Sequence, residues 1–242
     1  MKRVFLAFAC ICVSKFAFAT DFNLSIGGGG FGGAINGKQA CSFGDISATS
    51  FFPSKPLGCY GDGGAIFTDD EEIALKLRML RVHGSNPNDK YDNQLIGMNS
   101  RLDAIQAAVL SVKLKAFREY ELDAVNSVAN EYNKRLNGIV KTPTIRDGFY
   151  SSWAQYTIQL PDKKCRDNLK DFLEQKNIPS MIFYPKGMHA QPVFHKNCYG
   201  NDLPVSARLA DMVLSLPMHP YLKEADVQSI CECVAVNRRM GE

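Results

Sequence analysis

Strand-like and helix-like segments alternate along most of this chain, and the alternation constrains its fold more than any other feature of the sequence. β-Branched and aromatic runs favour strands, and apolar residues spaced three or four apart favour helices. Segments in such an order are typical of layered α/β or α+β folds. The predicted strands lie within 41–52 and at 65–68, 153–160 and 178–184, and the predicted helices are 165–176, 205–214 and 224–236.

The middle of the chain is predicted to be mostly helical. Asp69 and Asp70 can cap a helix that Gly84 ends. The polar, turn-rich stretch 85–100 is predicted to be a long loop of the kind that often binds ligands. A long amphipathic helix is predicted from Arg101, and a further helical stretch follows it. The apolar face predicted for the first of these is Leu102, Ile105, Val109, Val112 and Ala116.

Composition argues against several classes of protein. The formal net charge is only +3 and no long Lys/Arg block occurs, so no nucleic-acid partner is predicted. Eight cysteines are scattered without a CxxC pair, so no metal site is predicted and the cysteines are interpreted as free thiols. The basic start of the chain, the apolar stretch from Val4 to Val13 and the sequence Ala17-Phe18-Ala19 form a fair secretory signal pattern. That stretch is too short for a membrane span, so no membrane partner is predicted.

The most informative segment is SFFPSKPLG, residues 50–58. It places the hydroxyl of Ser50 at the end of a predicted strand, and Lys55 follows between Pro53 and Pro56. The prolines fix their own φ angles and restrict the residues before them, so Lys55 has little conformational freedom. A lysine held in this way can lose its hydration and supply the neutral amine that a Schiff base needs. On residue type alone, a solvated loop lysine is the commoner outcome.

Further motifs accompany this segment. In chain order they are Gly44-Asp45, Gly61-Asp62-Gly63-Gly64, Arg81-Val82-His83-Gly84, Gly97 to Ala104, Tyr184-Pro185 with His189 and Gln191, and Leu216 to Pro220. Together they resemble the signature of the DegT/DnrJ/EryC1/StrS family of sugar aminotransferases. The resemblance implies an α/β, fold-type-I enzyme that uses pyridoxal 5'-phosphate (PLP). A partial large-domain sheet would precede a C-terminal α+β small domain.

The resemblance also implies roles for three residues at the cofactor. Lys55 would hold PLP covalently and shuttle the proton during transamination, and Ser50 would hydrogen-bond the cofactor phosphate. Asn99 would reach the phosphate of a partner subunit's cofactor, because sites in this family form between the two subunits of a homodimer. From its place before a predicted helix alone, Asn99 could equally be a helix cap.

Three more residues are implied at the substrate. Arg101 would contact the substrate in the partner's site, and Tyr184 and His189 would line the sugar site. The wording FFPSKPLG most resembles enzymes that aminate C3 of a UDP-3-keto-N-acetylhexosaminuronic acid with glutamate as donor. The planar guanidinium of Arg101 suits such an anionic nucleotide sugar. On the residues alone, Arg101 could be an exposed first-turn residue and His189 a loop histidine.

The predicted function is therefore a PLP-dependent aminotransferase that acts on a nucleotide-linked keto-sugar in amino-sugar, surface-polysaccharide or lipopolysaccharide biosynthesis. Family members with histidine at the lysine position are dehydratases, so Lys55 favours transamination. One alternative is a non-catalytic family remnant or dimerisation partner. Another is an exported protein, which only residues 1–20 suggest.

One part of the family pattern is missing. Members carry a Glu-Asp-x-x-Gln stretch before the glycines that match Gly32-Gly33, and its aspartate pairs with the pyridine nitrogen of the cofactor. The matching positions fall near Ile26 and Gly29, so neither polar group is present. An acidic partner keeps that nitrogen protonated, which makes PLP an effective electron sink. We therefore expect little activity from this chain alone, and poor solubility from the open edge of a shortened parallel sheet.

The predicted organisation has three parts: a non-family segment at 1–30, a remnant of the PLP-binding large domain at 31–119, and a small domain at 120–242. The resemblance begins abruptly inside a predicted βα unit rather than in an exposed linker. We therefore expect residues 1–30 to result from gene damage or a misplaced start. A cytoplasmic location is expected, because PLP and nucleotide sugars are cytoplasmic. A true signal peptide at 1–19 would instead make the protein secreted.

Overall fold

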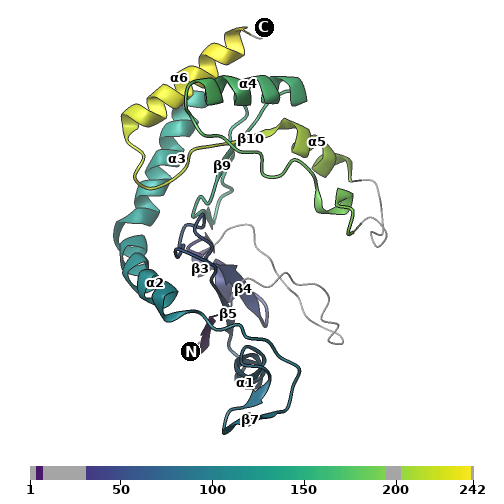
Figure 1. Cartoon of the computed structure of the whole chain (residues 1–242). Coiled ribbons are helices and arrows are strands. Elements are labelled where there is room, and N and C mark those ends of the chain that lie inside the picture. The colour runs from purple at the N-terminus through teal and green to yellow at the C-terminus, as the bar shows by residue number, and fades with distance from the viewer. Residues whose placement is uncertain (1–3, 8–30, 195–202, 241–242) are drawn as a thin grey trace. The chain divides into compact units, whose positions relative to one another are not determined.

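The computed structural model describes residues 4–7, 31–194 and 203–240. Contacts within the chain divide it into two compact units, whose helices and strands are drawn in Figure 1. Unit 1 comprises Met1–Leu122 and Arg146–Ala154, and unit 2 comprises Asp123–Ile145 and Gln155–Glu242. Each unit contains buried apolar residues of its own.

The main sheet of unit 1 has three strands in the order β1-β5-β4. β5 (Gly64–Thr68) is central, β4 (Ser47–Ser50) pairs with one edge, and β1 (Val4–Ala7) pairs with the other. Every pair of strands in the described part of the chain is antiparallel, so the prediction of a shortened parallel sheet is wrong there. A parallel pair needs a long crossover, usually through a helix, whereas the loop between β4 and β5 contains no helix and reverses the chain.

Helix α1 (Glu71–Leu80) follows β5 and begins as predicted, because the side chain of Asp70 accepts a hydrogen bond from the backbone N–H of Ile73 at 2.9 Å. The stretch predicted to be a long loop contains instead a hairpin of β6 (Ser85–Asn86) and β7 (Asp89–Asn93). The other short elements of unit 1 are β2 (Ala34–Ile35), β3 (Lys38–Gln39) and β8 (Phe149–Tyr150), which form a second sheet, and the turn η1 (Ala40–Ser42).

The predicted long helix is present as α2 (Ala104–Ala116), which continues through the π-helical turn η2 (Phe117–Glu121) into α3 (Leu122–Leu136). Its predicted apolar face is only partly correct. Ile105 and Val112 are each 76% exposed, whereas Leu110 is buried in the core. Helical spacing shows that apolar residues share a face, but α2 has apolar residues on two faces, and only packing decides which of them is covered.

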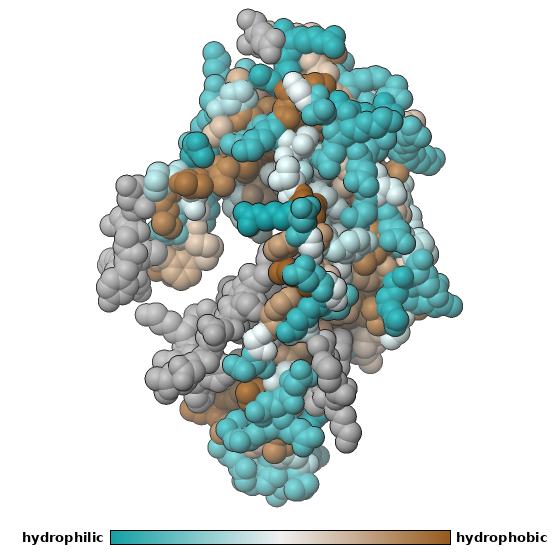
Figure 2. Space-filling model, turned by 180° about the vertical axis from the view of Figure 1, so that it is seen from behind, coloured by the Kyte–Doolittle hydropathy of each residue, from teal (hydrophilic) through white to brown (hydrophobic). Residues whose placement is uncertain are grey.

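Large apolar side chains are exposed at several places in unit 1. Figure 2 shows hydrophobic residues in brown among hydrophilic residues in teal on one face of the molecule. Contiguous exposed apolar surface commonly marks a site of interaction with another molecule. The most exposed of these side chains in unit 1 are Tyr60, Tyr91, Ile96, Ile105 and Val112.

Unit 2 packs helices on a two-stranded antiparallel sheet of β9 (Tyr156–Gln159) and β10 (Val213–Leu216). Helix α4 (Lys163–Gln175) contacts β10, and it also contacts α5 (Pro204–Met212) and α6 (Glu224–Met240), as Figure 1 shows. The unit also contains the short turn η3 (Met188–Ala190).

Two predictions for unit 2 are corrected. The predicted strand 178–184 is absent, and a single bridge joins Met181 to Ser215. The predicted helix 205–214 ends at Met212, and the next four residues form β10. Leu214 and Leu216 are buried on β10, and Pro217 follows, so the strand covers the core where a longer helix would meet a proline.

The core of unit 2 is built around two stacked tyrosines. The rings of Tyr132 and Tyr156 lie 4.7 Å apart between centroids, and both side chains are fully buried. The Tyr132 hydroxyl donates to the carbonyl of Pro217 at 2.9 Å, and the Tyr156 hydroxyl donates to Asn133 Oδ1 at 2.5 Å. Burial raises the pKa of both phenols well above its usual value. Both hydroxyl groups thus have hydrogen-bond partners inside the core, as buried tyrosines usually do.

Candidate active site

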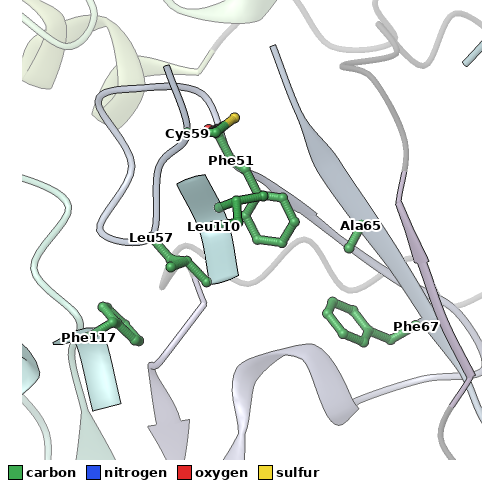
Figure 3. Close-up of a cluster of buried hydrophobic side chains, with 7 residues drawn as sticks. All are labelled: Phe51, Leu57, Cys59, Ala65, Phe67, Leu110 and Phe117. Carbon is green, nitrogen blue, oxygen red and sulfur yellow. Dashed lines mark hydrogen bonds between the residues drawn. The ribbon is translucent and has the colours of Figure 1, made fainter. Parts of the chain in front are cut away.

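Lys55 lies on a loop whose two ends are buried in the core of unit 1. Phe51, Leu57 and Cys59 are at most 3% exposed and belong to one cluster with Leu110 of α2 (Figure 3). Apolar side chains therefore precede and follow the lysine and anchor the loop on both sides. Lys55 itself is half-buried between them.

Backbone hydrogen bonds close this loop. The N–H of Phe51 donates to the carbonyl of Gly63 at 2.7 Å, and the N–H of Cys59 donates to the carbonyl of Phe51 at 2.8 Å. Within the loop, the N–H of Lys55 donates to the carbonyl of Phe52 at 2.8 Å. The backbone that carries the amine is thus held by short-range hydrogen bonds as well as by the prolines.

Gly58 lets the loop close. A Cβ atom at this position would lie 2.8 Å from the carbonyl oxygen of Pro53, 2.9 Å from that of Phe52 and 3.1 Å from that of Lys55. These neighbours are backbone atoms, which cannot swing away as a flexible side chain could. A larger residue at Gly58 would therefore reshape the segment that presents Lys55.

The polar groups of Ser50 and Lys55 fit a phosphate-bearing carbonyl cofactor. Among the described residues the Lys55 amine has neither a hydrogen-bond partner nor an ion-pair partner. Ser50 ends β4, and its Oγ accepts from the N–H of Phe52 at 3.2 Å, which leaves the hydroxyl proton available to an acceptor. A neutral amine can bind an aldehyde, and a hydroxyl can donate to a phosphate oxygen. Ile26 and Gly29, near which the family's acidic and amide groups would fall, lie outside the described residues.

Asn99 and Arg101 lie together on the surface of unit 1. Both side chains are exposed, and Arg101 Nη2 donates to Asn99 Oδ1 at 3.2 Å. Asn99 is not a helix cap, because Asp103 occupies the N-cap position of α2. Arg101 lies before the helix, so it is not a first-turn residue either. A guanidinium and an amide side by side can bind an anionic or polar ligand that approaches from outside the unit.

The two motifs that flank the hairpin pair with each other. The N–H of His83 donates to the carbonyl of Met98 at 3.0 Å, and the N–H of Ser100 donates to the carbonyl of Arg81 at 2.9 Å. Gly84, with a φ of +77°, has no space for a side chain because the backbone of Leu95 lies against it. The end of α1 thus holds the segment that carries Asn99 and Arg101.

Tyr184 and His189 belong to unit 2 and are held much less. Tyr184 is 67% exposed, and His189 is half-buried in η3. Neither side chain hydrogen-bonds to a described residue, although the Tyr184 ring meets that of Phe183 edge-on at 5.5 Å between centroids. The structure therefore gives these two residues the access that a ligand-lining role requires, and their roles stay predictions.

The contacts of two residues near Lys55, Cys59 and Gln106, were not predicted from the sequence. The Cys59 thiol lies 3.0 Å from the carbonyl oxygen of Phe51 and 3.1 Å from that of Gly61. Gln106 of α2 accepts a hydrogen bond from the N–H of Tyr60 at 2.8 Å. In the sequence, Gln106 is a polar residue next to the apolar positions of a predicted helix. That pattern alone could have marked it as a candidate for a polar contact.

Three further observations on the described residues concern metals, membranes and disulfides. In the parts of the chain that the structure describes, no cluster of three or more His, Cys, Asp or Glu side chains is arranged to bind a metal ion. None of the helices described combines the length and the hydropathy that crossing a bilayer requires. All cysteines in the same residues are free thiols, namely Cys41, Cys59, Cys165, Cys231 and Cys233.

Two known proteins with similar sequences are named as aminotransferases of UDP-linked sugars. The UDP-2-acetamido-2-deoxy-3-oxo-D-glucuronate aminotransferase of Pseudomonas aeruginosa is 41% identical over 202 residues, which are 83% of this chain and 54% of that protein. The UDP-N-acetyl-3-dehydro-alpha-D-glucosamine 3-aminotransferase of Acidithiobacillus ferrooxidans is 40% identical over 204 residues, 84% of this chain and 53% of that protein. This chain thus spans about half the length of the curated relatives it matches.

Comparison of structures also finds a sugar aminotransferase family. A crystal structure of a DegT DnrJ EryC1 StrS aminotransferase from Brucella abortus superposes with a TM-score of 0.78 at 46% identity, covering 84% of this chain and 54% of that one. The α/β fold of the fold-type-I enzymes is therefore confirmed. The family model itself matches residues 28–235. This chain belongs to the DegT/DnrJ/EryC1/StrS aminotransferase family.

Proposed function

We propose that this chain provides the lysine-bearing part of a PLP-dependent aminotransferase that acts on a nucleotide-linked keto-sugar. The observation that carries the proposal is Lys55, whose amine is uncommitted among the described residues and whose loop is fixed at both ends. A flexible loop would slow the reaction at Lys55, because the rate depends on how the reacting groups are oriented. Family membership makes PLP the cofactor that this amine would hold.

PLP, when bound, withdraws electrons from the carbon attached to the substrate nitrogen. The Lys55 amine would hold the cofactor and then carry a proton, since it is the basic group at the centre of the fixed loop. The Ser50 hydroxyl would donate to the cofactor phosphate, because its oxygen already accepts from Phe52 and its proton is unused. The loop backbone would keep both groups at a constant separation.

The proposed substrate is a UDP-linked 3-keto sugar, with glutamate as the amino donor. Two relatives at 41% and 40% identity carry names that specify UDP-linked 3-oxo or 3-dehydro sugars. Arg101 would pair with the negative charge of such a substrate, and Tyr184 and His189 would contact the sugar. We propose that such products serve in amino-sugar and surface-polysaccharide synthesis, and that the reaction occurs in the cytoplasm, where PLP and nucleotide sugars are found.

We further propose that the working unit is a homodimer with shared sites. Asn99 and Arg101 are exposed and bonded to each other, so they are available to a ligand held by a partner subunit. The exposed Ile105 and Val112 on α2 would contribute apolar surface to the same contact. Asn99 would then contact the phosphate of the partner's cofactor and Arg101 the substrate bound there.

A second candidate is a non-catalytic member that binds the cofactor or pairs with an active homologue. The residues near the expected pyridine-nitrogen contact, Ile26 and Gly29, favour it because neither can be an acidic partner. An electron sink without that partner is weak, so we propose that this chain alone turns over slowly. Steady transamination of glutamate with a UDP-keto-sugar by the purified chain would exclude this candidate.

The decisive experiment tests for PLP on Lys55. The purified chain is incubated with PLP, reduced with borohydride, digested and mapped by mass spectrometry. We expect the pyridoxyl label on Lys55 and no label in Lys55→Ala. The exposed Lys90, in the same unit, supplies a matched control, and Lys90→Ala should label normally. A label on other lysines with Lys55 unmodified would exclude the proposed function.

A further inference from the structure

Gln106 links helix α2 to the end of the loop that carries Lys55. Its Oε1 accepts a hydrogen bond from the backbone N–H of Tyr60 at 2.8 Å, across 46 positions of sequence. The Tyr60 side chain is 85% exposed, so the contact holds the backbone at this position and not the ring. α2 is the helix whose Leu110 packs in the same core cluster as Phe51.

The residue after Tyr60 has no side chain, and Gln106 fills the space. A Cβ atom at Gly61 would lie 2.9 Å from Gln106 Nε2 and 3.4 Å from its Cδ. The amide of Gln106 therefore contacts two consecutive backbone positions, one by a hydrogen bond and one by close packing. A methyl group at position 61 would therefore push the Gln106 amide out of its present place.

The turn that Gln106 holds is joined to the start of the lysine loop through Cys59. The thiol lies within hydrogen-bonding distance of the carbonyls of Gly61 and Phe51. The Cys59 N–H also donates to Phe51, which is where the loop begins. Movement of the turn at Tyr60 and Gly61 would therefore displace the closing contacts of the loop.

From this geometry we infer that Gln106 is a positioning residue for Lys55, acting through the turn at Tyr60 and Gly61. The inference rests on the proposed function, since it concerns the lysine that would hold PLP. Gln106 touches neither Lys55 nor any reacting atom in this structure. Its effect is to keep the closed form of the loop, and with it the orientation of the amine, fixed relative to α2.

The test compares Gln106→Ala with Gln106→Glu in the full chain. The alanine removes the acceptor, whereas the glutamate keeps an acceptor oxygen at nearly the same place. Hydrogen exchange without cofactor should be about two- to tenfold faster across residues 51–61 in Gln106→Ala, as the loss of one hydrogen bond predicts. The rate of PLP attachment to Lys55 should fall by a similar factor. Gln106→Glu should restore both towards wild type.

A double-mutant cycle separates the Gly61 contact from general damage to the fold. Gly61→Ala should slow attachment in the wild-type background, because the new methyl group displaces the Gln106 amide. It should have less effect in the Gln106→Ala background, where that space is open. Ser111→Ala is the control and should match wild type, because the Ser111 hydroxyl donates to the carbonyl of Ala107 within the same helix.

The outcomes distinguish the two levels of the proposal. Faster exchange with an unchanged attachment rate in Gln106→Ala would overturn the positioning role and leave a merely structural contact. Additive effects in the double-mutant cycle would also overturn it. If the wild-type chain itself takes no PLP on Lys55 while the exchange results hold, the proposed function is what has failed.

Discussion

The loop that carries Lys55 and the segment that carries Tyr184 and His189 are held in opposite ways. The first is bounded by buried Phe51 and Cys59 and closed by backbone hydrogen bonds. The second is largely exposed, and the side chains of its two candidate residues make no hydrogen bond to any described residue. One region thus fixes its own shape within unit 1, and the other presents side chains to solvent.

The difference matches the chemistry proposed for each region. A group that holds a cofactor and transfers a proton must keep its position within a few tenths of an ångström, so a rigid loop suits Lys55. Residues that line a substrate site need access more than internal packing, so exposure suits Tyr184 and His189. Changes in the two regions should therefore have opposite effects on folding and on binding.

The largest effect on stability is expected when the buried side chain at the start of the lysine loop is removed. Phe51→Ala should lower the free energy of unfolding by about 3–5 kcal/mol, because a fully buried phenyl ring is removed from the core cluster. Urea unfolding followed by circular dichroism measures the change. The contrast between the two regions would be wrong if Phe51→Ala lowered the free energy of unfolding no more than Tyr184→Ala does.

A smaller effect is expected at the tightest point of the loop. Gly58→Ala should cost about 1–3 kcal/mol, because its Cβ would meet the carbonyl oxygens of Pro53 and Phe52. It should also slow PLP attachment to Lys55, since the loop must open to admit the methyl group. Gly138→Ala offers a contrast with open space around the added atom, although its φ of +75° carries its own strain. Wild-type stability and attachment in Gly58→Ala would show that the loop is not rigid.

The core of unit 2, whose strand β10 bonds to the backbone of Met181, can be tested by pH. Met181 is tied to Ser215 of β10 by two backbone hydrogen bonds, and Cys231 lies buried in the same unit. Burial raises the pKa of the Cys231 thiol to about 12. A raised folded-state pKa adds stability that is complete below the unfolded pKa and is lost as pH rises towards the folded one.

The free energy of unfolding of unit 2 should therefore fall from about pH 9 upward, by roughly 1 kcal/mol at pH 10. Cys231→Val should flatten the first part of this decline, while the buried tyrosines still act at higher pH. Chemical unfolding at a series of pH values gives the slope. An unchanged slope in the variant would mean that another group causes the loss.

The smallest effect on folding is expected in the exposed segment itself. Tyr184→Ala and His189→Ala should each change the free energy of unfolding by less than about 0.5 kcal/mol, as is usual for surface positions. Both should weaken binding of a UDP-linked keto-sugar to the PLP-loaded protein, which calorimetry can measure. A large loss of stability with unchanged binding would reverse the comparison between the two regions.

Much of the lysine loop was readable from the sequence, because its causes are local. Pro53 and Pro56 restrict their neighbours, and the position of Ser50 at the end of a strand follows from the strand pattern. The helix cap at Asp70 was predicted for the same reason, since a cap depends on residues three positions apart. Family membership was also predicted from the order of motifs and is confirmed by the family match.

Other features required contacts between distant residues. The exposure of Ile105 and Val112 depends on which face of α2 meets the core, and spacing alone is the same for either face. Strand β10 replaced the end of a predicted helix because Leu214 and Leu216 find a core to cover. Short apolar runs do not distinguish a strand from a helix until a partner such as β9 is known.

The sequence by itself determined the family to which the chain belongs, and it supplied the candidate residues of the site and the prolines that flank Lys55. The tertiary structure decided that Gln106 holds Tyr60, that the backbone of Arg81 holds Ser100, and that Asn99 pairs with Arg101. The reason is physical: torsional and capping preferences act over a few residues, whereas packing and hydrogen bonds between separate segments exist only once the chain has folded.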